Sequence, residues 1–400
     1  MELRCSLQMY EWGKVGENSE AALLARANNP SLQIQDLTPY AELWMGTHPN
    51  GPSRLASTGE NLHEWIQQNP QVLGEPVRQR FGVQLPFLFK VLSVNKALSI
   101  QVHPSKIQAE ELHRLLPDIY KDPNHKPEMA LALSPFEALC GFRPLDQIKH
   151  FLNTVPELRS CVGQENVETL LSCSEDTQQE VLGQCFQSLM TRGDDIITTA
   201  LTSLLNRISS LDESSRGMHL ADLVERLHSQ FPGDVGVFGP YLFNHVTLQP
   251  GESLYLAANE PHAYLSGDCV ECMACSDNTV RAGLTPKLKD VPTLCSLLSY
   301  ICEPASSKLF VGTDEDEFTT IFRPPVPDFA VVKITVPEGR TYTMTPRPSA
   351  SIAIVTQGCA TSPTLPLHRG SVFFLPADDS VQFTVTSTEP LLLFQAMANV

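Results

Sequence analysis

The spacing of hydrophobic residues changes twice along this chain, and this change constrains the fold more than any other feature. Between residues 85 and 133, short apolar and β-branched runs are broken by Pro, Asn and Asp, which is typical of strands. After Pro144 the apolar residues recur at i, i+3, i+4 and i+7, the spacing of one helix face. Strand-like runs return at Val235 and continue almost without interruption to Val400. The pattern predicts a helical segment inserted between regions of β-sheet.

Four groups of residues carry the helical spacing. They are Ile148, Phe151, Leu152 and Val155; Leu182, Cys185, Phe186 and Leu189; Leu201, Leu204, Leu205 and Ile208; and Leu220, Leu223, Val224 and Leu227. Pro232-Gly233 closes the segment, because proline and glycine continue a helix poorly. We expect residues 1–144 and 233–303 to form one β-domain with residues 145–232 inserted as a helical domain. Residues 304–400 are expected to form a second β-domain.

Composition narrows the class of protein. A chain of 400 residues is long enough for two or three domains with ample apolar content. Its net charge of −17 argues against nucleic-acid or anionic-membrane binding, which needs a broad basic surface. An anionic ligand would therefore be held by a local cluster of cations. Eleven scattered cysteines do not resemble a disulfide framework, and neither a signal-peptide run nor a membrane span is visible, so we expect a cytoplasmic protein.

The run Leu98-Ser99-Ile100-Gln101-Val102-His103-Pro104 alternates apolar and polar side chains. In a strand, Ser99, Gln101 and His103 would share one face, while the apolar residues face a core. An amide oxygen and an imidazole two residues apart suit a bound cation. The alternative for this run alone is a surface strand with a polar outer face.

Two further segments carry possible metal ligands. Glu128 begins a strand-like run in which Ala130 and Ala132 share its face, and these small neighbours leave room for a ligand. Pro261-His262 enters another strand with a fixed backbone before the imidazole. Taken alone, Glu128 could equally be a solvated carboxylate, and His262 an ordinary polar histidine.

The sequence predicts that the segment from Cys275 to Lys287 is a polar loop between apolar runs. It carries Asp277, Arg281 and Lys287, and such a loop could clamp a phosphate or stabilise an enediolate. A solvated loop is the alternative. The nearby spacing Cys269-x-x-Cys272-x-x-Cys275 resembles thiolate ligation, but no second Cys or His pair follows at zinc-finger spacing, so buried thiols are favoured.

Together these segments resemble the type I phosphomannose isomerases of animals and fungi. The resemblance is carried by residues 40–49, 85–104, 124–143 and 261–297 and, with the domain order, covers nearly the whole chain. It implies a mainly β cupin fold: two jelly-roll-like barrels with an inserted helical domain. It also implies one zinc ion per chain, held by Gln101, His103, Glu128 and His262. The second barrel would lack metal, because residues 369–376 match a cupin strand without its partner histidines.

The resemblance implies interconversion of mannose 6-phosphate and fructose 6-phosphate through a cis-enediol, with no redox cofactor. This reaction would supply mannose 6-phosphate for GDP-mannose synthesis and glycosylation. The family's active-site arginine falls on Arg281, in the motif Ser-Asp-Asn-x-x-Arg-Ala-Gly. The expected catalytic residues are Arg281, Lys126, Glu271 and Asp277. The expected substrate-binding residues are Ser99, Lys90, Lys287 and His48.

Several points stay open at this stage. The general base could be Glu271 or Asp277, which lie near the arginine motif, or His48. A carboxylate whose pKa is raised by burial could act as this base. Two His and one carboxylate also form the facial triad of iron oxygenases, although Gln101 and the cationic loop count against that class. A metal-containing sugar-phosphate binding or storage module is the non-enzymatic alternative. We expect a monomer whose only partners are small sugar phosphates.

Overall fold

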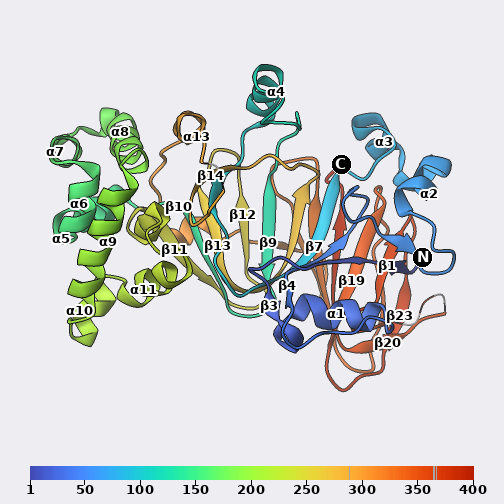
Figure 1. The fold of residues 1–400 in the computed structure, drawn as a ribbon. Coiled ribbons are helices and arrows are strands. Elements are labelled where there is room, and N and C mark those ends of the chain that lie inside the picture. The colour runs from blue at the N-terminus through green and yellow to red at the C-terminus, as the bar shows by residue number, and fades with distance from the viewer. Residues whose placement is uncertain (288, 364, 366) are drawn as a thin grey trace.

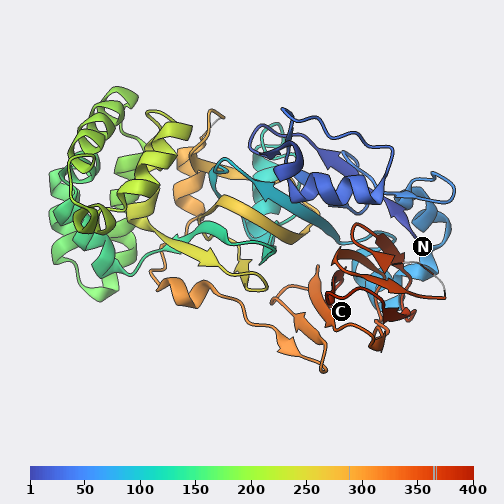
Figure 2. The same cartoon turned by 90° about the horizontal axis from the view of Figure 1, so that it is seen from below.

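The computed structural model describes residues 1–287, 289–363, 365 and 367–400. Helices form one end of the elongated molecule, a first β-region forms the middle, and a second β-region forms the other end (Figure 1). Both chain termini lie at the end formed by the second β-region, and Figure 2 shows the N-terminal segment lying beside it. The order in space therefore differs from the order in sequence, because the helical segment lies at one end of the molecule beside the first β-region and not between the two β-regions.

The first β-region is built mainly from one sheet with the order β11-β10-β13-β7-β5-β2, to which β8, β9, β12 and β14 are attached. Its strands are β2 (Ser6–Gln8), β5 (Glu42–Met45), β7 (Phe87–Val94), β8 (Ile100–Val102), β9 (Glu128–Ala132), β10 (Phe136–Phe142), β11 (Phe243–Leu248), β12 (Ser253–Leu256), β13 (His262–Ala274) and β14 (Val280–Gly283). Strands from both sides of the helical insertion pair within this sheet, so the insertion interrupts the sequence of the β-region and leaves its sheet intact.

Strand β13 ties the first β-region together because it changes partners along its length. Residues 262–266 pair with β10, whereas Gly267 to Ala274 pair with β7, and β9 lies on the other side of residues 269–273. The change occurs at Gly267, which has a φ of +110° and lies so close to the backbone of Pro135 that a Cβ atom would clash. This bend lets one strand carry two parts of the site described below.

The N-terminal portion adds short strands and helices around the sheet. These are β1 (Leu3–Arg4), β3 (Lys14–Val15), β4 (Pro39–Tyr40), β6 (Arg54–Leu55), α1 (Glu20–Asn28), α2 (Leu62–Gln68), α3 (Glu75–Phe81) and α4 (Lys106–Leu115). The expectation of sheet throughout residues 85–133 is wrong at α4. Ser105 and Gln108 form a capping box at its start, and this local signal was present in the sequence.

The inserted segment is helical as predicted. Its helices are α5 (Leu145–Thr154), α6 (Pro156–Val162), α7 (Gln164–Ser172), α8 (Gln178–Met190), α9 (Asp194–Ile208), α10 (Glu213–Met218), α11 (Ala221–Gln230) and α12 (Gly239–Leu242). The four predicted apolar faces lie on α5, α8, α9 and α11 and pack into one core. The expectation of a strand from Val235 is wrong, because Val235–Phe238 is a 3-10 helix and the strand begins at Phe243. A short, fully buried apolar run does not by itself distinguish strand from helix.

The second β-region contains two sheets. Its strands are β15 (Thr313–Asp314), β16 (Thr319–Phe322), β17 (Ala330–Val336), β18 (Thr341–Thr343), β19 (Ser351–Gln357), β20 (Cys359–Thr361), β21 (Leu367–His368), β22 (Val372–Leu375), β23 (Gln382–Val385) and β24 (Leu391–Met397). The predicted apolar runs form β19, β22 and β24, as expected. The sequence predicted strands almost without interruption to Val400, but residues Val291–Leu297 form the helix α13. The side chain of Asp290 caps this helix by accepting a hydrogen bond from the backbone N–H of Thr293.

The two β-regions share an apolar core. Side chains from the first region, such as Phe87 and Met129, lie in the same buried cluster as Phe329, Ile352 and Phe374 from the second. The backbone N–H of Phe374 also donates to the carbonyl oxygen of Met1. The second region is therefore an integral part of the fold and not a loosely tethered domain.

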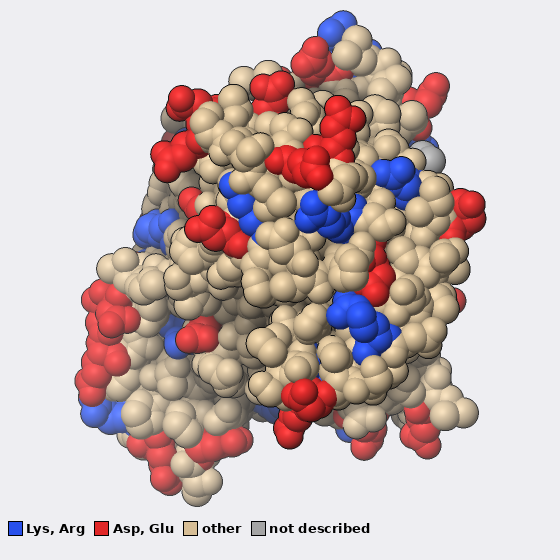
Figure 3. Space-filling model, turned by 90° about the vertical axis from the view of Figure 1, so that its left-hand side faces the viewer, with Lys and Arg blue, Asp and Glu red and all other residues tan. Residues whose placement is uncertain are grey.

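The helices of the described ranges lack the combination of length and apolar character that a bilayer span requires. Figure 3 views the helical end of the molecule, where acidic and basic side chains are interspersed over the described surface. A mixed surface of this kind does not present a broad basic face to a polyanion.

Candidate metal and substrate site

Four polar side chains from three strands converge at one end of the first β-region. Gln101 lies in β8 and His103 follows that strand directly, while Glu128 begins β9 and His262 begins β13. Potential ligand atoms of His103, Glu128 and His262 lie within 4.8 Å of one another. Gln101 is paired in register with His262, and its Nε2 lies 3.3 Å from Nε2 of that imidazole. The four residues predicted as metal ligands are thus brought together.

Backbone carbonyl groups fix the orientation of both imidazoles. The Nδ1 of His103 lies 2.7 Å from the carbonyl oxygen of Asn278, and the Nδ1 of His262 lies 3.0 Å from that of Glu260. Because a carbonyl oxygen only accepts, each Nδ1 carries the hydrogen and donates it. The Nε2 of each ring is left facing Glu128, which is the arrangement found in histidine metal ligands.

The converging atoms are poorly satisfied by each other. His103 Nε2 and His262 Nε2 lie 3.5 Å and 3.3 Å from Glu128 Oε2, which is longer than a good charge-assisted hydrogen bond. Within the described part of the chain, neither His103 Nε2 nor Glu128 Oε2 has a hydrogen-bond partner, although both atoms are buried. An unsatisfied buried polar atom costs about 1–3 kcal/mol, so this donor set suits a metal ion placed between the three side chains.

The charges at this site favour metal ligation. Burial lowers the pKa of His103 to about 4, so its imidazole is neutral at physiological pH. Burial alone would raise the pKa of Glu128, but Lys126 and the neighbouring imidazoles outweigh burial and hold it well below its usual range. The Nζ of Lys126 lies 3.2 Å from Glu128 Oε1. The carboxylate is therefore ionised, with one oxygen held by Lys126 and the other directed at the imidazoles.

A cavity of about 470 Å³ adjoins the converging residues. Its polar walls include Ser99, Gln101, Arg281 and Lys287, and Tyr10 and Trp12 add aromatic surface. A second cavity of about 550 Å³ shares Arg281 and Lys287 with it. Volumes of this size fit a small ligand. Three cations, Lys96, Arg281 and Lys287, and one carboxylate, Glu11, line this cavity, so its wall favours an anion.

Arg281 does not lie in a loop, as the sequence suggested, but in the short strand β14 (Val280–Gly283). It is paired in register with Gln101, which places the guanidinium beside the candidate metal ligands. Burial lowers the pKa of Arg281. No hydrogen bond or ion pair joins its guanidinium to any other residue that the structure describes. An unpaired, partly buried guanidinium at a cavity wall is available to a ligand.

A buried ionic network lies deeper in the first β-region. The Nζ of Lys90 lies 3.1 Å from Glu271 Oε2 and 3.4 Å from Glu42 Oε2, and the Tyr264 hydroxyl donates to Glu271 Oε1 at 2.9 Å. Burial raises the pKa of Glu271, and the negative charges of Glu128 and Glu42 raise it further against the opposing effect of Lys90. Burial would lower the pKa of Lys90, but the two carboxylates raise it. Lys90 is thus charged and forms ion pairs with Glu271 and Glu42.

His48 and Asp277 form a separate pair. Their Nε2 and Oδ1 atoms lie 3.6 Å apart, and His48 also packs edge-on against the ring of Trp44. The contact with His48 lowers the pKa of Asp277, whose side chain is 74% exposed. A depressed pKa and high exposure make this carboxylate a weaker base than the buried Glu271.

The sequence reasoning missed four residues that line or support this site. Tyr10 and Trp12 line the cavity beside Gln101, and their sequence spacing carries no signal for this position. Tyr264 follows His262 by two residues on β13, so strand alternation could have placed it on the same face. Glu42, which holds Lys90 and accepts a hydrogen bond from Trp44 Nε1, needed the pairing of β5 with β7 to be found.

The cysteine spacing does not form a thiolate site in this fold. Cys269 and Cys272 pack in different apolar clusters, because residues three apart on a strand point to opposite sides. Burial raises the pKa of both thiols well above the usual value.

Models of three protein domains match this chain. The type I phosphomannose isomerase catalytic domain matches residues 1–145, the helical insertion domain of the same family matches residues 161–243, and its C-terminal domain matches residues 320–361. A mannose-6-phosphate isomerase from Bos taurus is 48% identical, over 98% of this chain and 97% of its own length. The chain belongs to the type I phosphomannose isomerase family. It shares 47% identity with the mannose-6-phosphate isomerase of Homo sapiens and 41% with one of Arabidopsis thaliana.

Solved structures of phosphomannose isomerases have the same fold. The apo form of mannose 6-phosphate isomerase from Salmonella typhimurium is 33% identical, has a TM-score of 0.84, and is matched over 100% of this chain and 99% of its own. A mannose 6-phosphate isomerase bound with zinc and yttrium is 32% identical, also with a TM-score of 0.84. This type I phosphomannose isomerase therefore has the expected cupin architecture with a helical insertion, as the resemblance implied.

Proposed function

We propose that this chain is a zinc-dependent aldose–ketose isomerase that interconverts mannose 6-phosphate and fructose 6-phosphate through a cis-enediol. The observation that carries the proposal is the buried set of His103, Glu128 and His262, with unsatisfied ligand atoms, beside a cavity lined by Arg281 and Lys287. A metal ion and an anion-binding wall at one site suit a phosphorylated sugar. The names of the relatives, all mannose-6-phosphate isomerases, support the same substrate.

Gln101, His103, Glu128 and His262 would hold one zinc ion per chain. Two imidazoles, one ionised carboxylate and an amide oxygen are ligands that zinc accepts, and Gln101 brings its side-chain amide to the same point. When bound, zinc supplies a Lewis acid that stabilises negative charge developing on sugar oxygen atoms. The remaining chemistry belongs to side chains of this protein.

Glu271 is our candidate for the general base, rather than Asp277 or His48. As a carboxylate it would remove the proton from C2 of the open-chain aldose and return that proton to C1, while hydroxyl protons move between O1 and O2. Its raised pKa, its contacts with Tyr264 and Lys90, and its position on β13 opposite Ala130 support this role. Lys90 would therefore act on Glu271 and not directly on the substrate. This role differs from the substrate-binding role that was expected for Lys90 from the sequence.

The three cationic residues have different proposed tasks. Arg281 would stabilise the charge that develops on the enediol oxygens, because it adjoins Gln101 and has no competing partner among the described residues. Lys287 and Ser99 line the same cavity and would bind the phosphate. Lys126 would hold Glu128 and add positive charge at the metal site. His48, with Asp277, would border the substrate without transferring its C2 proton.

We further propose that this reaction supplies mannose 6-phosphate for GDP-mannose synthesis and glycosylation, in the cytoplasm, and that the chain acts as a monomer. The resemblance to the family and the acidic, cysteine-containing composition support these assignments.

The decisive experiment is turnover of mannose 6-phosphate by the zinc-loaded protein, with fructose 6-phosphate measured in a coupled assay. Substrate deuterated at C2 distinguishes the route, because a base exchanges part of the label with solvent, whereas a direct hydride shift would deliver all of it to C1. We expect fructose 6-phosphate, about one zinc per chain and loss of activity on chelation. Oxygen consumption would favour the iron oxygenase alternative. Binding of mannose 6-phosphate without turnover by zinc-loaded protein would favour a binding module.

A further inference from the structure

Two of the ion pairs among the described residues link the first β-region and its N-terminal helices to the strands of the second β-region and the connector before β17. Arg369, next to β21, contacts Glu20 of α1 at 2.5 Å through Nη2 and Oε2. His125, just before β9, contacts Asp328 at 3.0 Å through Nε2 and Oδ2. Asp328 lies in the connector that leads into β17, and its side chain is only 6% exposed. The second pair differs from the first because it adjoins the metal site in sequence.

The residues before β9 form an irregular segment that leads directly into the metal site. His125 contacts Asp328, the next residue, Lys126, contacts Glu128 at 3.2 Å, and Glu128 faces the two imidazoles. These neighbouring side chains therefore reach in different directions, one to the second β-region and one to the candidate ligands. A shift of His125 would move the backbone that carries Lys126.

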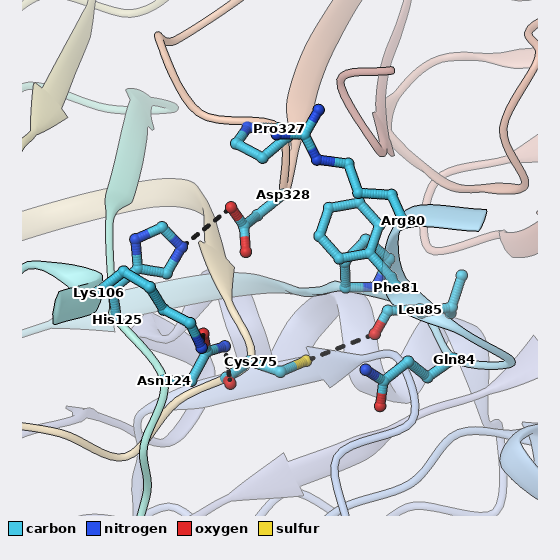
Figure 4. Close-up of a pocket in the computed structure, with 11 residues that line it drawn as sticks. Arg80, Phe81, Gln84, Leu85, Lys106, Asn124, His125, Cys275, Pro327 and Asp328 are labelled. Atoms are coloured by element: carbon cyan, nitrogen blue, oxygen red, sulfur yellow. Dashed lines mark hydrogen bonds and ion pairs between the residues drawn. The ribbon is translucent and has the colours of Figure 1, made fainter. Parts of the chain in front are cut away.

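This segment is not densely packed on the side of Asp328. A cavity of about 600 Å³ lies there, and Figure 4 shows His125, Asp328 and Asn124 on its walls together with Arg80 and Pro327. Packing cannot fix a side chain that borders a cavity, so directional polar contacts must do so. The dashed contact from His125 to Asp328 in Figure 4 is the polar contact that joins the segment to the second β-region across this space.

Hydrogen bonds hold the preceding residue on its other side. Asn124 Nδ2 donates to the carbonyl oxygen of Cys275 at 2.9 Å, and the carbonyl oxygen of Asn124 accepts from Asn278 Nδ2 at 2.7 Å. Asn278 is also the residue whose carbonyl fixes His103. Asn124 is therefore anchored within the first β-region, while His125 depends on Asp328.

We propose that Asp328 is a positioning residue for catalysis, which acts through His125 to hold Lys126 and Glu128 in register with the metal site. This inference rests on the proposed isomerase function. It gives the second β-region, which carries none of the candidate ligands, a direct effect on turnover beyond its contribution to stability.

The test compares Asp328→Asn with Glu20→Gln, because both substitutions remove one carboxylate from an ion pair that joins the same parts of the fold. We expect Asp328→Asn to lower kcat by about 10- to 100-fold, the cost of a small misplacement of catalytic groups, with little change in KM and with zinc retained. Glu20→Gln should leave kcat unchanged. Asp328→Glu, which keeps the carboxylate, should recover part of the lost turnover.

Two further variants test the route through His125 and Lys126. His125→Gln should reproduce the loss of kcat, and the double variant with Asp328→Asn should lose no more than either single variant. In a Lys126→Ala background, Asp328→Asn should lower kcat by a smaller factor than it does in the wild-type protein, because only its effect through Glu128 remains. If Asp328→Asn does not fold, His125→Gln carries the same comparison with Glu20→Gln.

The inference is overturned if Asp328→Asn and His125→Gln keep wild-type kcat, or if Glu20→Gln lowers kcat as much as they do. Equal losses would mean that linking the two β-regions matters only for general stability. An inactive wild-type protein would instead refute the proposed isomerase function, so the two failures are distinct.

Discussion

The Nδ1 of His103 donates a hydrogen bond to the backbone carbonyl oxygen of Asn278 at 2.7 Å. This contact sets the tautomer of the imidazole and leaves Nε2 free to face Glu128. It also joins the segment after β8 to the segment between β13 and β14, which carries Asp277 before it enters the strand of Arg281. A single main-chain oxygen thus couples this candidate metal ligand to the cationic wall of the cavity.

His262→Ala should strip the metal from the protein. The substitution removes one of the two imidazoles whose Nε2 atoms face Glu128, and the remaining ligands leave the ion exposed. Elemental analysis after dialysis should show a large loss of zinc, together with a loss of turnover. His63→Ala, on the exposed start of α2, is the control and should retain both. Full zinc content and full turnover in His262→Ala would show that His262 is not a ligand.

Arg281→Ala should lower turnover by orders of magnitude while the metal is retained. Loss of a group that stabilises developing charge costs about 3–4 kcal/mol of transition-state energy. Because Arg281 has no protein partner among the described residues, its removal should scarcely change the melting temperature. Steady-state kinetics and zinc analysis on the same preparation check this result. Near-normal kcat would exclude the catalytic role of Arg281.

The activity should fall on the acid side at a pH above the usual range of a carboxyl group. Glu271 works as a base only when ionised, and burial raises its pKa above 4.5, so protons switch the base off as the pH falls through that raised value. Lys90→Met removes the cation that opposes this rise, so the acid limb of kcat/KM should move to still higher pH. Glu271→Gln should abolish turnover at every pH. An acid limb that does not move in Lys90→Met would argue against Glu271 as the base.

The second β-region should hold no metal of its own. His368, the single histidine between residues 328 and 400, is exposed in β21 and its Nδ1 contacts the carbonyl oxygen of Arg369. His368→Ala should leave zinc content and turnover essentially unchanged. An anomalous-scattering map with a second ion inside this region would overturn the expectation.

Deletion of residues 304–400 should give insoluble protein. The first β-region shares its apolar core with Phe329, Ile352 and Phe374, and removing these residues would expose Phe87 and Met129 to water. Solubility and light scattering measure the outcome. A soluble, monomeric truncated chain would show that the shared core is dispensable.

Local pattern was enough for much of the fold, whereas the set of candidate ligands came from the resemblance to a known family. Strand alternation placed Gln101 and His103 together, and the i, i+3, i+4, i+7 spacing located the helices of the insertion. Local pattern failed where tertiary packing determined whether a short segment became helix or strand, as at residues 235–238 and at β14. The helix α4 was different, because Ser105 and Gln108 carried its signal and were overlooked. The limits 1–144, 145–232, 233–303 and 304–400 for the domains stay a prediction.

The sequence by itself determined the residue types and periodicities, and these indicated a helical insertion between regions of β-sheet. The resemblance to type I phosphomannose isomerases, and not the periodicity, implied the cupin fold and a site made of Gln, His and Glu. Only the tertiary structure decided which distant side chains meet: Glu42 with Lys90, Tyr264 with Glu271, and Asp328 with His125. Periodicity indicates the face of a strand or helix on which a side chain lies, because the direction of a side chain follows from the local backbone geometry. Contacts between strands depend on sheet order and register, which are set by the packing of the whole chain.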